Sequence, residues 1–230
     1  MMDDQPRSTS NAKVIPTTRH PSRIPPATGF SKTGTADIVP YKLDAGMVEI
    51  RKQWSSGNRR SARKLCTKLM SEYPDHGDLH QINGLIYNES GQIAEAVKSL
   101  ENACNTPDPK PVYFTDLAAI LGNAGYEQQA KTVLYAAVQR FPVDGKAHLQ
   151  LGILQTRGMG ARSAIPHLKR AIALSPTDWT SWSAMGATLM SLDDIQSAMN
   201  HFGKALQYAQ NDRNQQAISD IKISIGECHK

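Results

Sequence analysis

The chain has 230 residues, of which 40% are hydrophobic and only 6% aromatic, a balance that suits closely packed helices and is unlike an all-β protein. No apolar run reaches the roughly 18 residues that a membrane-spanning helix needs, so no transmembrane segment is expected. The net charge of +5 belongs to residues 1–78, which hold 13 Lys and Arg against 8 Asp and Glu, whereas residues 79–230 are neutral with 13 of each.

The first segment, residues 1–42, is rich in Pro, Ser, Thr and Arg and has no apolar periodicity, so we expect a disordered tail. The alternative to a merely solvated tail is a flexible docking arm or a secretion or targeting signal. The segment lacks the apolar stretch of a secretory signal and has no cysteine that could carry a lipid. A cytoplasmic location is therefore predicted.

From about Asp44 onward the pattern becomes helical and repeats every 34 residues, five times, without an insertion. In each unit two apolar stretches at helical spacing flank a turn, which predicts two helices per unit. Glycines recur in the turn, where a positive φ is expected, and prolines recur at the unit boundary, where a helix must stop. The units are 43–76, 77–110, 111–144, 145–178 and 179–211, the turn glycines are Gly57, Gly91 and Gly125, and the boundary prolines are Pro74, Pro142 and Pro176.

Small residues recur at the slots where the two helices of a unit would cross, because helices pack closely only where the side chains are small. The first-helix slot holds Gly84, Ala118, Gly152 and Gly186, and the facing slot holds Ala62, Ala96, Ala130, Ala164 and Ala198. One such unit cannot bury its own apolar face, so the units must stack.

With these residues in register over about residues 43–211, the chain resembles the tetratricopeptide repeat (TPR) family. The fifth unit supplies most of the signature, namely Trp182, Met185, Gly186, Leu189, Ala198, Phe202 and Ala205. The resemblance implies an all-α fold, a right-handed α-solenoid of about five helix-turn-helix units, and a role in protein–protein interaction as an adaptor or scaffold within a multiprotein assembly.

Three places depart from the regular pattern. The first unit has Ile50 where Gly or Ala belongs, as expected for an atypical terminal repeat. Residues 212–230 carry Ile218, Ile221 and Ile225 on one face, which predicts a C-terminal helix that covers the last unit. Pro166 lies inside the second helix of unit four, and we expect a local kink or a late helix start there.

Catalytic and cofactor motifs are missing from the sequence: there is no metalloprotease, nucleophile-elbow, phosphate-loop or Cys-x-x-Cys pattern. The three scattered cysteines give no disulfide framework and no metal-ligand spacing. His80 and His148 occupy the slot of Trp182, and His167 and His201 share another slot, so packing explains them better than metal binding. We therefore predict that the chain is not an enzyme and carries neither a cofactor nor a metal.

In the TPR family the first helices line a concave face that binds a peptide segment or a partner helix. The matching slots are mostly small, apolar or amide-bearing, which suits an apolar or amphipathic ligand. These candidate groove residues are Gln81, Leu85, Asn88, Thr115, Ala119, Asn123, Leu149, Ile153, Arg157, Ser183, Ala187 and Met190. At the slots where some TPR proteins hold the terminal carboxylate of a chaperone tail, only Arg51 is cationic, so such a clamp is not expected.

A run of basic residues in the first unit offers an alternative. No acidic residue lies between Arg51 and Lys68, and the basic set is Arg51, Lys52, Arg59, Arg60, Arg63, Lys64 and Lys68. This set could form a solvated face or bind an acidic protein, an anionic lipid surface or nucleic acid. Nucleic acid is the weakest of these because stacking aromatic residues are not interleaved. A minor alternative is a bacterial pilus-assembly or secretion TPR factor.

Overall fold

The computed structural model describes residues 39–158 and 160–228. Of the tail predicted to be disordered, residues 1–42, the part up to residue 38 lies outside the described residues, as do the last two residues of the chain; the prediction is wrong for residues 39–42, which belong to the first helix. Eleven α-helices and no strands occur within the described residues. They are α1 (Val39–Ser55), α2 (Arg59–Glu72), α3 (Gly77–Glu89), α4 (Ile93–Cys104), α5 (Pro111–Asn123), α6 (Glu127–Arg140), α7 (Gly145–Arg157), α8 (Ala161–Leu174), α9 (Trp179–Ser191), α10 (Ile195–Asn211) and α11 (Gln215–Glu227).

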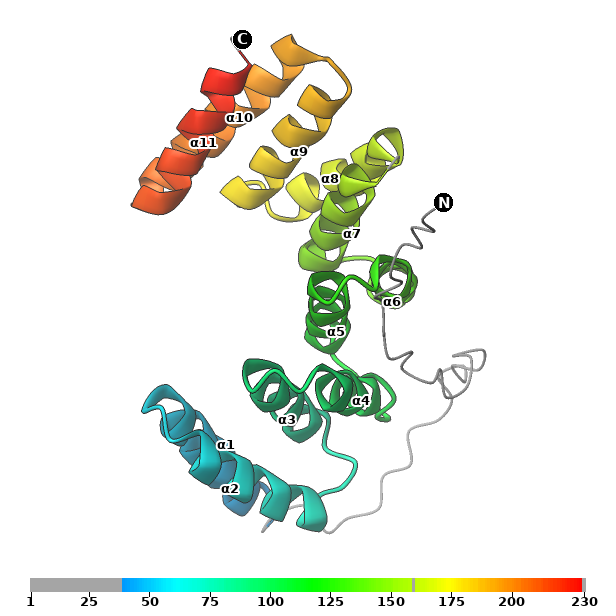
Figure 1. Cartoon of the computed structure of the whole chain (residues 1–230), viewed down its shortest axis with the longest axis vertical. Coiled ribbons are helices and arrows are strands. Elements are labelled where there is room, and N and C mark those ends of the chain that lie inside the picture. Colours follow the sequence, from blue (N-terminus) through cyan, green and yellow to red (C-terminus); the bar gives the residue numbers. More distant parts are fainter. Residues whose placement is uncertain (1–38, 159, 229–230) are drawn as a thin grey trace, which may run out of the picture.

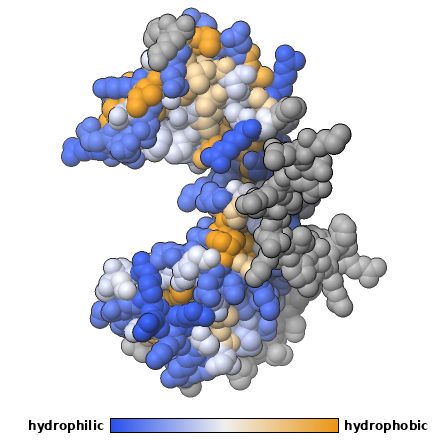
Figure 2. All heavy atoms as spheres, in the orientation of Figure 1, coloured by the Kyte–Doolittle hydropathy of each residue, from blue (hydrophilic) through white to orange (hydrophobic). Residues whose placement is uncertain are grey.

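The helices pair in chain order and the pairs stack into a curved solenoid (Figure 1), which confirms the predicted all-α TPR fold. In this view α5 and α7 border the open side on the left, whereas α4 and α6 lie on the opposite side. Figure 2 shows the same open side as a hollow between the upper and lower parts of the molecule, with apolar atoms at its base. The first helix α1 begins at Val39, slightly ahead of the expected start of unit one.

The turns inside the units share one backbone geometry. The φ angle is positive at Gly57, Gly91 and Gly125, at 77°, 72° and 86°, as the recurring glycines predict. In each turn the N–H of this residue and the next N–H bond carbonyls of the last helical turn, for example Gly91 N to Asn88 O and Gln92 N to Tyr87 O. The left-handed residue thus reverses the chain and satisfies carbonyls that the helix end leaves without partners.

The same turn also occurs at two positions that have no glycine. Asp193, between α9 and α10, has a φ of 63°, and Arg213, between α10 and α11, has a φ of 55°. Arg213 N bonds Gln210 O and Asn214 N bonds Ala209 O, so α11 follows α10 through the turn that elsewhere joins the two helices of one unit. The C-terminal helix α11 therefore forms a helical hairpin with α10. Its Ala217 and Ile221 are buried in one hydrophobic cluster with residues of α10.

Glycine at the crossing slot allows the two helices of a unit to approach closely. A Cβ on Gly84 would lie 2.8 Å from Leu100 Cγ, and one on Gly152 would lie 2.5 Å from Leu168 Cδ2. In unit one, Ile50 occupies this slot and is fully buried. The close approach moves one helical turn earlier, to Gly46, where a Cβ would lie 2.5 Å from Leu69 Cδ1.

At three unit boundaries, the ring N–H of a residue on the first helix of one unit donates to the carbonyl oxygen of the boundary proline of the preceding unit. Trp182 Nε1 donates to Pro176 O at 2.8 Å, and the Nε2 atoms of His80 and His148 lie 2.6 and 3.3 Å from the oxygens of Pro74 and Pro142. A carbonyl only accepts, so each histidine ring carries its proton on Nε2. These histidines therefore replace the tryptophan as hydrogen-bond donors and do more than fill space.

Pro166 lies within α8, which starts at Ala161, at the same slot as the other second helices. Helix α8 therefore does not start late, which was one of the two effects expected of Pro166. Pro166 is exposed, and the bond that it cannot donate would have reached a carbonyl in the first turn of α8.

Replacing Gly152 with Ala is expected to lower the free energy of unfolding by about 1–3 kcal/mol, because the new methyl group overlaps the fully buried Leu168. Gly203 is the matched control: it is also helical, but nothing lies within 4 Å of a Cβ built there. Gly203→Ala should stabilise by up to about 1 kcal/mol through helix propensity. Thermal and denaturant unfolding followed by circular dichroism measures both changes, and equal shifts of the same sign would contradict the close-approach argument.

Candidate functional site

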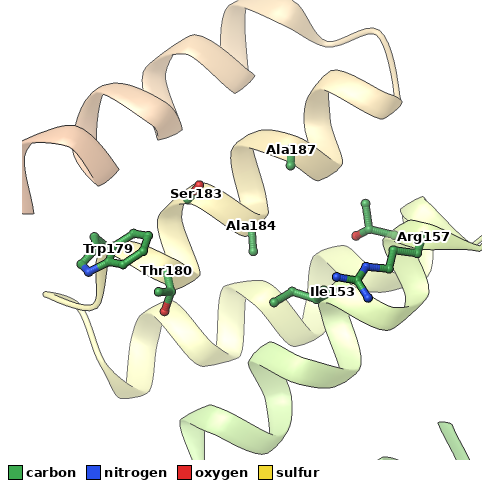
Figure 3. A pocket seen from close by; sticks show the side chains of 8 residues that line it. Ile153, Arg157, Trp179, Thr180, Ser183, Ala184 and Ala187 are labelled. Carbon is green, nitrogen blue, oxygen red and sulfur yellow. The ribbon is translucent and has the colours of Figure 1, made fainter. Parts of the chain in front are cut away.

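The concave face holds two pockets, each between the first helices of neighbouring units. The upper pocket lies between α7 and α9 and has a volume of about 320 Å³ (Figure 3). Its lining residues are Ile153, Thr156, Arg157, Trp179, Thr180, Ser183, Ala184 and Ala187. The lower pocket lies between α1 and α3, has a volume of about 300 Å³ and is lined by Ile50, Arg51, Trp54, Gln81, Ile82 and Leu85.

Six of the twelve predicted groove residues line these pockets. Ile153, Arg157, Ser183 and Ala187 line the upper pocket, and Gln81 and Leu85 line the lower one. In Figure 3 the guanidinium of Arg157 points back over Ile153 towards the middle of the pocket, and Trp179 closes the far end.

The other predicted groove residues lie outside the pockets. Thr115 is buried and its hydroxyl donates to Val112 O within α5, so it offers no group to a ligand. Leu149 packs against the core that contains Leu168 and Met185. Met190 lies under the end of α11, with its Sδ atom 3.7 Å from Cys228 Sγ. The remaining three are on the first helices of units two and three, where Asn88 is half-buried and Ala119 and Asn123 are exposed.

Sequence reasoning missed the aromatic end wall of the upper pocket. Trp179 is the first residue of α9, ahead of the slots that line the TPR groove, and Thr180 and Ala184 also lie outside those slots. The signal available was the rarity of tryptophan, since only three occur in the chain and Trp182 already accounts for the signature position.

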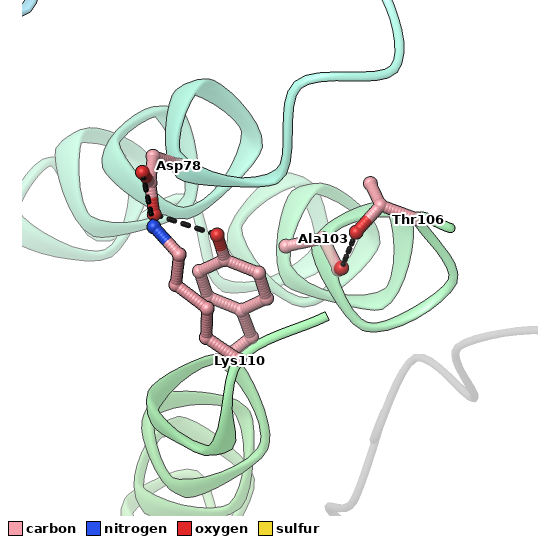
Figure 4. A network of polar contacts seen from close by, with 5 residues as sticks. Asp78, Ala103, Thr106 and Lys110 are labelled. Carbon is pink, nitrogen blue, oxygen red and sulfur yellow. Dashed lines mark hydrogen bonds and ion pairs between the residues drawn. The ribbon is translucent and has the colours of Figure 1, made fainter. Parts of the chain in front are cut away.

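Polar contacts join α3 to α5, the first helices of units two and three. Gln81 Nε2 donates to Asp116 Oδ2 at 2.6 Å. One turn earlier, Asp78 accepts from Lys110 Nζ and from the Tyr113 hydroxyl, both at 2.6 Å (Figure 4). Burial alone would raise the pKa of Asp78, but these two hydrogen bonds outweigh it, and the pKa is lowered.

The predicted basic patch does not form one surface. Arg59 pairs with Glu89 at 2.6 Å, and its guanidinium lies 4.6 Å from the centre of the Trp54 ring. Arg63 lies at the same distance over Tyr87 and donates to its hydroxyl at 3.2 Å. Both arginines therefore join unit one to unit two.

The rest of the basic set divides between two places. Arg51 lines the lower pocket, and Lys52 is exposed on α1. Arg60, Lys64 and Lys68 are exposed along one face of α2, and within the described residues no side-chain hydrogen bond or ion pair includes them.

A histidine pair joins α7, which carries Ile153 and Arg157, to α8. The Nδ1 atoms of His148 and His167 are 3.2 Å apart, and the rings are stacked. His148 already donates from Nε2 to Pro142 O, so its Nδ1 accepts the proton of His167. Burial lowers the pKa of both imidazoles, and the proximity of His148 lowers the pKa of His167 further.

In residues 39–158 and 160–228, no three His, Cys, Asp or Glu side chains gather so that they could hold a metal ion. In the same part of the chain, every helix is too short or too polar to cross a membrane. The expectations of no catalysis, no cofactor and a cytoplasmic location stay predictions.

The fold is shared by solved TPR structures, although no protein-family model matches the chain. MamA from Desulfovibrio magneticus RS-1 has a TM-score of 0.62 and 18% identity, with 74% of this chain and 96% of that one covered. A Pseudomonas aeruginosa pilF structure has a TM-score of 0.63 and 12% identity, with 80% and 90% covered. At these identities the likeness concerns the fold alone, and it confirms the TPR solenoid.

One curated relative is similar in sequence. The anaphase-promoting complex subunit cut9 of Schizosaccharomyces pombe is 24% identical over 176 residues, which are 76% of this chain and 26% of cut9. The structure of the Cut9–Hcn1 hetero-tetramer has a TM-score of 0.63 with this chain, at 18% identity, covering 81% of it and 37% of that chain. The chain thus spans about a quarter of the curated relative that it matches.

The histidine pair predicts a pH dependence of stability. Because the folded pKa values lie below the ordinary value, the stabilisation is fully present above about pH 6.5 and declines as the pH falls towards the folded pKa values. Between pH 7.5 and pH 5.5, the melting temperature of a His148→Phe, His167→Gln double variant should decrease by less than that of the parent protein. His201→Gln is the control, since that ring faces Trp182 rather than a second histidine. Equal losses in parent and double variant would refute the assignment.

Proposed function

We propose that the chain is a non-catalytic adaptor or scaffold that captures a segment of a partner protein on the concave face of its TPR solenoid. The observation that carries the proposal is the pair of pockets between neighbouring first helices, at α1–α3 and α7–α9. The Cut9–Hcn1 hetero-tetramer supports a protein as the kind of partner that this fold can bind.

A preformed surface favours binding because little of its own chain has to be ordered when the partner arrives. The first helices are held before binding by partly buried hydrogen bonds: Gln81 bonds Asp116 across α3 and α5, and Thr156 bonds Thr188 across α7 and α9 at 2.7 Å. Thr188 is fully buried, so the second bond sets the spacing of the two helices that form the upper pocket. A chaperone-tail carboxylate clamp is not part of the proposal, because the clamp slots other than Arg51 carry no cation.

Ile153→Asp and Ala187→Asp should each weaken capture of the partner at least tenfold, because both place a charge in the apolar part of the upper pocket. The immobilised full-length chain, incubated with its native lysate, provides the assay. Val143→Asp is the matched control, since Val143 is 72% exposed in the α6–α7 connection. Helicity and melting temperature are measured for all three variants. Undiminished capture by folded Ile153→Asp and Ala187→Asp proteins would rule out use of the groove.

A second candidate function is binding of an anionic surface or nucleic acid through α2. The specific observation in its favour is the row of Arg60, Lys64 and Lys68, which are exposed at i, i+4 and i+8 and take part in no ion pair within the described residues. Arg59 and Arg63 are not included in this row, because their guanidinium groups contact Glu89 and Tyr87 of unit two.

Salt dependence separates this second function from groove capture. If the α2 row binds duplex DNA, the slope of log affinity against log salt should fall by about 0.9 for each cation replaced by glutamine at positions 60, 64 and 68. Fluorescence anisotropy with a labelled duplex measures the slope, and the Arg51→Gln variant serves as control because Arg51 lies in the lower pocket. A slope that is unchanged in the triple variant would exclude the α2 row as the contact.

A further inference from the structure

The upper and lower pockets have the same construction, although they lie three units apart in the stack. Each is formed between consecutive first helices, each has one tryptophan and one arginine in its lining, and each has aliphatic side chains between them. The sequence period does not produce this likeness, since Trp54 and Trp179 occupy different slots of their units. Similar chemistry built from different positions suggests that both pockets accept the same kind of group.

The upper pocket has an apolar interior with little side-chain bulk on one wall. Ser183, Ala184 and Ala187 present that wall from α9, and Ile153 faces them from α7 (Figure 3). Because these α9 residues are small, the space between the two helices stays open. An apolar side chain placed there would remove its surface and that of Ile153 and Trp179 from water, which is favourable.

In the lower pocket the tryptophan is held in place by contacts outside the pocket. Arg59 donates to the carbonyl oxygen of Trp54 and stacks over its ring. Glu89 on α3 in turn holds Arg59 through the ion pair. The indole is therefore fixed before any ligand arrives, next to Ile82 and Leu85.

Each pocket carries the positive charge of one arginine, and no acidic side chain in its lining neutralises that charge. Arg51 and Arg157 are exposed, and within residues 39–158 and 160–228 neither takes part in an ion pair. No Asp or Glu lines either pocket. A carboxylate on the ligand would complement each guanidinium and could accept two parallel hydrogen bonds from it.

We propose that each pocket binds an apolar side chain whose neighbouring residue carries a carboxylate, and that the partner segment contains two such pairs, one for each pocket. This inference rests on the proposed function, because it specifies the partner that the concave face takes. The apolar side chain enters between the two first helices, and the carboxylate pairs with Arg51 in the lower pocket or Arg157 in the upper one.

The tryptophans allow a direct test on the full-length chain. The three indole N–H signals report Trp54, Trp179 and Trp182 separately by NMR, and Trp182 is an internal control because its N–H is bonded to Pro176 O. The probe is N-acetyl-leucyl-glutamate with an amidated C-terminus, titrated to millimolar concentration, so that the glutamate side chain is its only carboxylate. We expect the Trp54 and Trp179 signals to shift with saturation while the Trp182 signal stays in place. The C-terminally amidated N-acetyl-leucyl-glutamine, which has no carboxylate, should bind about fivefold more weakly, which corresponds to the roughly 1 kcal/mol of an exposed ion pair.

Three variants assign the response to individual pockets. Arg157→Gln and the pocket-filling Ala187→Leu should abolish or weaken the shift of Trp179 alone, and Arg51→Gln should affect Trp54 alone. All three side chains are exposed, so the fold should tolerate the changes. Equal binding of the two dipeptides, equal shifts of all three indoles, or no shift at Trp54 and Trp179 would each overturn the proposal.

The test also distinguishes this proposal from the proposed function. If the dipeptide shifts neither indole while Ile153→Asp still abolishes partner capture, the groove binds its partner by other chemistry and only the present proposal fails. If the dipeptide binds as expected while Ile153→Asp and Ala187→Asp leave capture intact, the pockets have the stated preference but the proposed function fails.

Discussion

The close approach of the two helices within each unit is the constraint on which the rest of the structure depends. A residue without a bulky side chain on the first helix faces a large buried residue on the second, as Gly152 faces Leu168 and Gly186 faces Phe202. This contact sets the distance between paired helices, and stacking of the pairs then sets the spacing of the first helices along the concave face. Unit one keeps the constraint but moves it to Gly46, because Ile50 fills the usual slot.

The first helices along the concave face are joined by polar contacts as well as by packing. Between α3 and α5 these are the Gln81–Asp116 bond and the contacts of Asp78, and between α7 and α9 the Thr156–Thr188 bond. The pockets occur where an aromatic residue stands next to smaller neighbours, as Trp179 does beside the small residues of α9. A partner that spans both pockets would also cross the hollow between the upper and lower parts of the molecule, which has apolar atoms at its base (Figure 2).

The cationic residues of unit one are divided by the fold into different roles. Arg59 and Arg63 form stacking and hydrogen-bonding contacts with unit two, so their charge is partly used within the molecule. Arg51 faces the lower pocket, and Arg60, Lys64 and Lys68 face solvent on α2. The excess positive charge of residues 1–78 consequently does not describe a single binding surface, even though the residues are neighbours in the sequence.

The sequence by itself determined the units, the turn glycines and the crossing slots, because these follow from a 34-residue period and from local backbone requirements that each unit meets alone. It also placed Ile153, Arg157, Ser183 and Ala187 on the inner face through their slots. Only the tertiary structure decided that Thr115 is buried, that Trp179 closes a pocket and that Arg59 turns towards Glu89. These outcomes depend on which side chains of adjacent units meet across the interface, and a pattern read along one unit does not contain that information.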